Sequence, residues 1–326
     1  MQNSLTRRRF MLMMAALSTA PLISTCALKQ LPISIGLQAW PGYEPIPLAR
    51  GLGWLDETKV KLVQTSSATE SLKLLEQGKI DGAGLTLDEV LRAREKGIAL
   101  SVILVFDISV GADMLLARPE IKSLAAIKGL RVGVEEGALG ALMLHEVLKA
   151  AGIKREDVSI VSLTIDQQAE AWRRDNIDAV VTYEPVASQI KAMGAEKLFD
   201  SSQIPEVILD VLAVRSSLID AAHGDALHHL VATHLRALKY LNANPDAASY
   251  YLASHFKMPP EQVLASLKGL VLPDLENNTR LLATSSPAIL KSSAIISETM
   301  QKAGILHHPA DLKNLLHPEF LPKEVS

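Results

Sequence analysis

The sequence has one cysteine, few aromatic residues and no long apolar run. A single Cys in 326 residues excludes a disulfide framework, a zinc knuckle and any cluster held by several thiolates. The apolar stretch at residues 10–23 is too short for a membrane-spanning helix, which needs about 20 residues. The formal net charge of −3 leaves no excess of basic residues, which argues against nucleic acid as a partner.

The overall composition is that of a soluble globular protein. Hydrophobic residues make up 48% of the chain and charged residues 21%, which excludes a disordered or collagen-like chain. A length of 326 residues is enough for roughly two compact domains, each with its own core.

The first 26 residues have the pattern of an export signal. Three arginines at 7–9 precede the apolar stretch, and small residues follow it, as in a secretory signal. Residues 6–11 (Thr-Arg-Arg-Arg-Phe-Met) resemble the twin-arginine signal. Residues 22–26 resemble a bacterial lipobox, in which Cys26 is the candidate lipidation site, although Thr25 departs from the usual Gly or Ala. We expect a periplasmic protein, either soluble or lipid-anchored to the membrane.

From residue 33 to about residue 214, strand patterns alternate with helix patterns. The spacings Ser67-x-x-Glu70 and Thr86-x-x-Glu89 are those of capping boxes, which mark helix starts. This alternation predicts an α/β protein with parallel sheets between helices. The predicted strands are 33–39, 59–64, 80–85, 130–134, 158–163 and 178–183.

After residue 214 only helices are predicted. Asn-Pro, Pro-Pro and Ser-Pro pairs stand at or near the starts of three of them. No low-complexity linker divides the chain, so two lobes would be joined by chain crossings and not by a tether. The predicted helices of this region are 221–242, 245–255, 260–267 and 287–303.

Several kinds of chemistry have no motif here. The chain has no P-loop and no Gly-x-Ser-x-Gly elbow, and the spacing of Gly133, Gly137 and Gly140 is wrong for a dinucleotide fingerprint. His228, His229 and His234 fall in one predicted helix at spacings that put no pair on the same face. We therefore expect no metal, no cofactor, no catalytic residue and no enzyme activity.

The ends of the predicted strands carry the candidate ligand-binding residues. In open parallel sheets ligands bind beyond the carboxyl ends of the strands. Three of the thirteen aromatic residues fall there, beside small hydroxyls and helix starts that suit a small polar ligand. The candidates are Trp40, Tyr43, Ser66, Thr86, Asp88, Ser109, Gly111, Asp113, Gly137, Ala138, Tyr183 and Glu184.

Each candidate also has a structural explanation. Thr86 is explained as a helix cap, Trp40 as a core residue, Gly137 as part of a tight turn, and Glu184 as a partner of the helix dipole. The clustering at strand ends carries more weight than any single residue. We expect Trp40→Ala to lose most ligand affinity and to leave the fold intact.

Four segments resemble the nitrate/sulfonate/taurine-type (NitT/TauT, SsuA/THI5-like) substrate-binding proteins of ABC importers. The resemblance covers residues 33–215 and extends more loosely to the end. A cysteine-rich motif of the family's thiamine-precursor enzymes has no counterpart in this chain. The matching segments are 40–43 (Trp-Pro-Gly-Tyr) with 48–55, 75–84, 124–133, and 178–185 (Asp-Ala-Val-Val-Thr-Tyr-Glu-Pro).

This resemblance implies a two-lobed type II periplasmic-binding-protein fold, with mixed, mostly parallel sheets flanked by helices and a helical C-terminal region. Lobe one would comprise residues 31–112 and 211–326, and lobe two residues 113–210. The crossings would lie near 114–118 and 211–215.

The function implied is capture of a small solute by hinge closure, for delivery to the permease and ATPase subunits of an importer, by a monomer. A ligand sensor that signals to a membrane receptor is one alternative, and an enzyme on the same fold is another. Helix starts and hydroxyls suit an anion such as a sulfonate or nitrate. Asp88, Asp113 and Glu184 beside aromatic residues favour an amine or a pyrimidine-like ring.

Overall fold

The computed structural model describes residues 31–256, 258–283 and 287–325. The chain divides after Leu31, and residues 32–326 form the compact unit described below. The predicted export signal and Cys26 lie outside the described residues. Among the helices that are described, none is both long enough and apolar enough to cross a bilayer.

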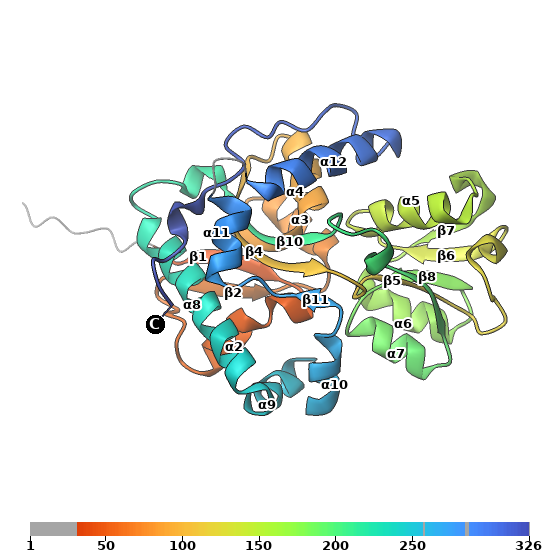
Figure 1. Cartoon of the computed structure of the whole chain (residues 1–326), viewed down its shortest axis with the longest axis horizontal. Coiled ribbons are helices and arrows are strands. Elements are labelled where there is room, and N and C mark those ends of the chain that lie inside the picture. Colours follow the sequence, from red (N-terminus) through yellow and green to blue (C-terminus); the bar gives the residue numbers. More distant parts are fainter. Residues whose placement is uncertain (1–30, 257, 284–286, 326) are drawn as a thin grey trace, which may run out of the picture. The chain divides into compact units, whose positions relative to one another are not determined.

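The first sheet has six strands in the order β11-β4-β10-β3-β1-β2 (Figure 1). Strand β1 is parallel to β2 and β3, whereas β10 runs antiparallel to both β3 and β4. The central β4 is apolar along most of its length, as expected for a strand covered on both faces. The strands are β1 (Ile33–Leu37), β2 (Val60–Gln64), β3 (Gly82–Thr86), β4 (Leu100–Ser109), β10 (Leu209–Arg215) and β11 (Leu270–Val271).

The second sheet has five strands in the order β7-β6-β8-β5-β9. Strand β6 is parallel to β7 and β8, and β5 is antiparallel to β8 and β9. The predicted mixed α/β architecture is therefore confirmed. The sheets are not mostly parallel, however, because β5, β10 and β11 make antiparallel pairs and these are five of the nine strand pairs among the described residues. The strands are β5 (Met114–Ala117), β6 (Arg131–Val134), β7 (Ser159–Ser162), β8 (Ala179–Thr182) and β9 (Glu196–Asp200).

Helices cover both faces of each sheet. Figure 1 shows α5 on one face of the second sheet and α6 and α7 on the other. Around the first sheet, α3, α4 and α12 lie on one side and α2 and α8 on the other. The helices are α2 (Pro45–Gly51), α3 (Ala68–Glu76), α4 (Leu87–Glu95), α5 (Gly140–Ala151), α6 (Ile165–Arg173), α7 (Val186–Ala192), α8 (Gly224–Ala243), α9 (Pro245–Phe256), α10 (Pro260–Ser266), α11 (Leu275–Leu282) and α12 (Ala288–Lys302), with short 3-10 turns η1 (Pro41–Tyr43), η2 (Leu124–Ile127), η3 (Arg155–Asp157), η4 (Ser201–Gln203), η5 (Ser216–Leu218) and η6 (Pro318–Phe320).

The sheets take their strands from different stretches of the chain. The first sheet uses residues 33–109 and 209–271, and the second uses residues 114–200. The lobe boundaries at 112–113 and 210–211 stay a prediction. One cluster of buried side chains includes residues from strands of both sheets, such as Val105 in β4 and Leu115 in β5.

The C-terminal region departs from the prediction of helices alone. Strand β11 pairs antiparallel with the end of β4, at Leu270 with Ser109 and Val271 with Ile108. Two residues carry no periodic pattern, so the sequence gives no signal for this strand. Helix α11 is not predicted either, although Asp274 caps it by accepting a hydrogen bond from the Asn277 N–H at 2.9 Å.

The predicted cap at the start of α3 is partly confirmed. The Ser67 hydroxyl oxygen accepts the Glu70 N–H at 3.1 Å, as a capping box requires. The Glu70 carboxylate, however, accepts from the N–H and hydroxyl of Ser66 and not from Ser67. Glu70 therefore fixes the residue before the cap, where the chain enters the helix.

Candidate functional site

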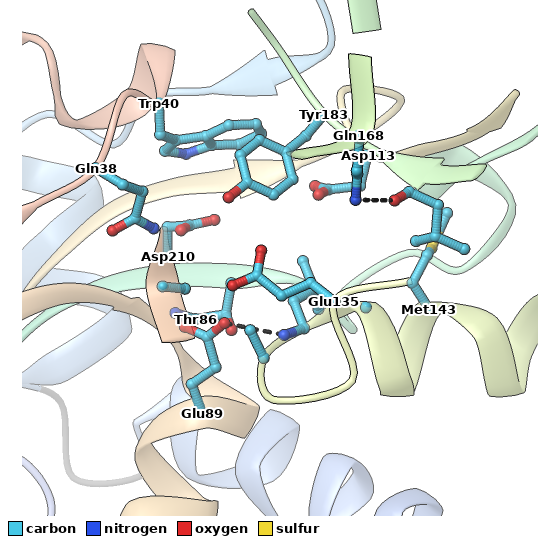
Figure 2. A pocket seen from close by; sticks show the side chains of 15 residues that line it. Gln38, Trp40, Thr86, Glu89, Asp113, Glu135, Met143, Gln168, Tyr183 and Asp210 are labelled. Carbon is cyan, nitrogen blue, oxygen red and sulfur yellow. Dashed lines mark hydrogen bonds between the residues drawn. The ribbon is translucent and has the colours of Figure 1, made fainter. Parts of the chain in front are cut away.

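A cavity lies at the boundary between the two sheets, where β1, β3, β6 and β8 end (Figure 2). Its volume is about 30 Å³, well below the roughly 300–1,000 Å³ of typical small-molecule sites. A ligand of ordinary size therefore enters only if the walls move apart. The cavity is lined by Gln38, Trp40, Ala68, Thr86, Glu89, Asp113, Glu135, Ala138, Leu139, Gly140, Met143, Gln168, Val181, Tyr183 and Asp210.

Two aromatic rings form one wall of the cavity. Trp40 follows β1 and Tyr183 follows β8, and their rings meet edge to face with centroids 5.2 Å apart. Figure 2 shows them on the opposite side of the cavity from Glu135 and Thr86. The Trp40 indole N–H donates to Asp107 Oδ2 at 2.9 Å, which fixes the orientation of the ring. An aromatic face of this kind is suited to a flat or cationic group.

Glu135, which follows β6, joins elements of both sheets. Its Oε1 accepts hydrogen bonds from the N–H and the hydroxyl of Thr69 in α3, at 3.0 and 2.6 Å. Its Oε2 accepts the N–H of Ile165, the first residue of α6, at 3.1 Å. One carboxylate thus holds backbone N–H groups at the starts of two helices.

Glu89 in α4 makes a second connection between the sheets. Its Oε2 accepts the Thr86 N–H at 2.9 Å, which is the carboxylate half of the predicted capping box. Its Oε1 accepts the N–H of Leu139, just before α5, also at 2.9 Å. The Thr86 hydroxyl donates to Asp88 Oδ1 at 2.7 Å. Glu89 therefore ties the first turn of α4 to the start of α5.

Two aspartates complete the polar lining, and two more lie directly behind it. Asp113 and Asp210 face the cavity and are each 3% exposed. The Tyr43 hydroxyl donates to Asp210 Oδ1. Asp88 and Asp107 are buried beside them. Within the described part of the chain, none of the side chains that line the cavity is Lys or Arg.

Burial raises the pKa values of these carboxyl groups. The pKa of Glu89 rises to about 8, through desolvation and then through the charge of Asp88. The pKa of Asp107 rises to about 8 and that of Asp113 to about 7, with desolvation the main cause in each. The pKa of Asp210 is also raised, by desolvation and by the charge of Asp107. Near neutral pH these carboxyl groups are therefore partly protonated.

We expect the ligand-free protein to lose thermal stability as the pH rises from 6.5 to 8.5. The folded chain keeps protons on these carboxyl groups that the unfolded chain releases near pH 4, so the free energy of unfolding falls as they ionise. Buried His234, whose pKa is lowered to about 3, has the opposite effect, but only below about pH 6.5. The pKa of His255 is raised by Glu44, and this contribution has the same sign as that of the carboxyl groups.

The measurement is the melting temperature at several pH values, for the unmodified protein and for Asp113→Asn. The variant removes one titrating group without changing its size, so its melting temperature should fall less over the same range. A melting temperature that is constant or rises with pH in the unmodified protein contradicts the expectation.

Five of the predicted ligand-binding residues line the cavity, and they come from both sheets. Tyr43 and Asp88 lie behind the lining, as hydrogen-bond partners of lining residues. For all of these residues, contact with a ligand stays a prediction. The five that line the cavity are Trp40, Thr86, Asp113, Ala138 and Tyr183.

The other predicted residues lie away from the lining, in local hydrogen-bond networks. The Ser109 hydroxyl and the Gly111 N–H both bond to the Ser201 hydroxyl. The Glu184 carboxylate accepts from the Ser188 N–H and from Lys191. Ser66 is held by Glu70, and Gly137 packs against Thr69.

Sequence reasoning missed several polar residues of the lining. Glu135 directly follows the predicted strand 130–134, so strict use of the strand-end rule would have found it. Gln38 directly follows β1, but it fell inside the predicted strand 33–39, which extends two residues too far. Asp210 near the start of β10 gave no such signal, because β10 runs antiparallel to β3 and brings its first residues to that edge. Gln168 and Glu89 lie inside helices and had no separate pattern.

No group of three or more His, Cys, Asp or Glu side chains is arranged to hold a metal ion within residues 31–256, 258–283 and 287–325. The carboxyl groups of the cavity wall instead accept hydrogen bonds from backbone N–H, hydroxyl and indole groups.

Comparisons with solved structures identify the fold. The ligand-binding component of an ABC-type import system from Staphylococcus aureus, solved with zinc bound, has a TM-score of 0.74 at 18% identity, over 91% of this chain and 99% of that chain. The alkanesulfonate-binding protein SsuA from Xanthomonas axonopodis, solved with MOPS bound, has a TM-score of 0.72 at 18% identity, over 86% and 96%. At these identities the likeness shows a periplasmic-binding-protein fold.

The sequence comparison places the chain in a family. The model of the NMT1/THI5-like family matches residues 40–248, so the protein belongs to that family. A curated relative from Brucella abortus, named as a binding protein, is 28% identical over 154 residues, which are 46% of this chain and 48% of that protein. The chain thus spans about half the length of this and three further curated Brucella relatives that it matches.

Proposed function

We propose that this protein is the solute-binding component of an ABC importer and captures a small polar ligand outside the cytoplasm. The observation that carries the proposal is the cavity between the two sheets, whose lining comes from both and contains buried polar atoms without protein partners. The fold and the family add support, because the solved relative from Staphylococcus aureus is itself a component of an import system.

Capture would work by hinge closure between lobe one (31–112 and 211–326) and lobe two (113–210). The contacts between Glu89 and Leu139 and between Glu135 and Thr69 would hold the closed state. Arg92 in α4 would add to them, since its guanidinium donates to the carbonyls of Ala138 and Glu136 at 3.0 and 3.1 Å. A ligand that touches both lobes binds this state more tightly and shifts the population towards it.

The five predicted residues that line the cavity are the proposed ligand contacts. Trp40 and Tyr183 would pack on the ligand, and Thr86, Asp113 and the backbone at Ala138 would bond to its polar groups. The proposed partners are the permease and ATPase subunits, and the protein would act as a monomer. The export pattern at residues 1–26 supports a periplasmic location, with Cys26 as the candidate lipid anchor.

A thermal-shift screen of the purified protein tests solute capture. The panel contains sulfonates, nitrate, taurine, amines, pyrimidines and purines at millimolar concentration. A ligand at 100 times its dissociation constant stabilises the folded state by about 2.7 kcal/mol, which raises the melting temperature by a few degrees. Each compound is recovered and analysed afterwards, because a chemically changed compound would indicate an enzyme. A flat panel, with no small molecule released from denatured protein, contradicts the proposal.

A further inference from the structure

The cavity has the donor and acceptor pattern of a site for a cation. Four buried oxygen atoms in its lining have no hydrogen-bond partner among the described residues, and all four are acceptors when the carboxyl groups are ionised. Their side chains are at most 5% exposed. The hydroxyl of Tyr183 is the one further buried side-chain atom of this lining without a partner among the described residues, and it can donate or accept. The four acceptors are Gln38 Oε1, Asp113 Oδ2, Gln168 Oε1 and Asp210 Oδ2.

Several of the groups that would normally bind an anion already have partners. Anions bind at helix N-termini, where backbone N–H groups are free and the helix dipole is positive. Here Glu135 accepts the N–H groups of Thr69 and Ile165 at the starts of α3 and α6. Glu89 accepts the N–H group of Leu139 beside α5. A sulfonate or nitrate in this cavity would have to displace these carboxylates and then lie beside them.

We propose that the ligand captured by this protein is a small organic cation with N–H donors, of the amine or amidine class, held by Asp113 and Asp210 against the rings of Trp40 and Tyr183. This inference rests on the proposed function, whose site it uses. Asp210 lies in β10 of the first sheet and Asp113 directly precedes β5 of the second, so a cation between the two carboxylates would link the two sheets. The aromatic wall would contribute a cation–π contact.

The charged and titratable groups around the two aspartates are mostly carboxyl groups. Arg92 is the nearby cation, and it lies outside the lining with its guanidinium bonded to backbone carbonyls. The remaining neighbours are acidic or phenolic, so they favour a positive ligand. They are Asp88, Glu89, Asp107, Glu135, Tyr43 and Tyr183.

The first test uses two series of probes that differ in charge on a constant frame: benzamidine, benzamide and benzenesulfonate, and then acetamidine, acetamide and methanesulfonate. We expect at least one amidine to raise the melting temperature and its matched sulfonate to leave it unchanged. The proposal is overturned if a sulfonate stabilises the protein, if an amide does so as well as its amidine, or if no amidine stabilises it.

The small molecule released from denatured protein separates this proposal from the proposed function. A released cation supports both. A released anion overturns the cation proposal and leaves solute capture standing. If no compound of the wider panel binds and no molecule is released, solute capture itself fails.

The second test removes the charges one at a time. Asp113→Asn and Asp210→Asn keep the size of the side chain, and we expect each to weaken binding of the stabilising amidine about tenfold to a hundredfold. Asp225→Asn, in the exposed first turn of α8, is the matched control and should bind within about twofold of the unmodified protein. Equal affinity in both aspartate variants, each with a cooperative melting transition, overturns the proposal.

The third test uses pH on the unmodified protein and needs no variant. An amidinium ion keeps its charge over pH 6–8.5, whereas the cavity carboxyl groups lose protons over that range. A cation favours the ionised carboxylates, so its affinity should rise with pH and its binding should release protons, seen as a binding enthalpy that depends on the buffer. Affinity that falls or stays constant as the pH rises overturns the proposal.

Discussion

Gly42→Ala is expected to destabilise the protein and to weaken ligand binding at least tenfold. An added Cβ would lie 1.7 Å from Asp107 Oδ2 and 2.8 Å from the Trp40 indole nitrogen, so it would separate the donor and the acceptor that orient the Trp40 ring. Asp107 lies in the central strand β4 and is fully buried, so it has little room to move. Overpacking of this kind costs about 1–3 kcal/mol.

Thermal melting and binding of the best compound from the screen measure both effects. Gly224→Ala is the matched control, because the same added atom at the start of α8 meets nothing within 4 Å. A Gly42→Ala protein that melts and binds like the control would show that the contact between Trp40 and Asp107 does not shape the site.

Trp40→Ala is expected to abolish detectable binding and to lower the free energy of unfolding by about 3–5 kcal/mol. The sequence alone led us to expect an intact fold, but Trp40 is only 3% exposed and packs in a core cluster that includes Tyr43 and Phe106. Removal of the ring also takes the hydrogen-bond donor from the buried Asp107. The loss of packing and the loss of this hydrogen bond both destabilise the folded state.

Trp40→Phe separates packing from hydrogen bonding, since it keeps an aromatic ring and removes the indole N–H. We expect its stability and its affinity to fall between those of the alanine variant and the unmodified protein. Chemical denaturation gives the stability, and titration with the bound compound gives the affinity. If the stability of Trp40→Ala is unchanged, the ring is not buried as described. If its affinity is unchanged, Trp40 is not part of the site.

The sequence was a good guide wherever a signal was local. The strand of residues 130–134 and the helix of residues 245–255 were both predicted, because strand and helix periods and an Asn-Pro pair at a helix start are local patterns. Strands β4, β5, β9 and β10 were not among the predicted strands. The two-residue strand β11 and helix α11 were missed as well, since a pair of residues has no period and β11 exists only through its pairing with β4.

The candidate site was predicted in part for the same reason. The strand-end rule identified Trp40 and Tyr183, which directly follow parallel strands or their turns, but it could not identify Asp210, whose strand runs in the opposite direction. Thr86 was a candidate ligand-binding residue as well as a predicted helix cap, whereas Glu89 was predicted only as part of that cap. The structure confirms that bond and adds a second one, from Glu89 to Leu139, whose partner is 50 residues away in the chain.

The sequence by itself determined the α/β class, most of the helices and strands, the aromatic residues of the site and the resemblance to a family, because these depend on neighbouring residues and on motifs. Only the tertiary structure decided that carboxylates from distant segments converge on one cavity and that Glu89 and Glu135 accept N–H groups at helix starts. The physical reason is that hydrogen bonding, desolvation and charge interaction act through space. The sequence shows Glu89 only as part of a helix cap. In the folded protein its carboxylate is part of a buried acidic site, because the sheets bring the other carboxyl groups close to it.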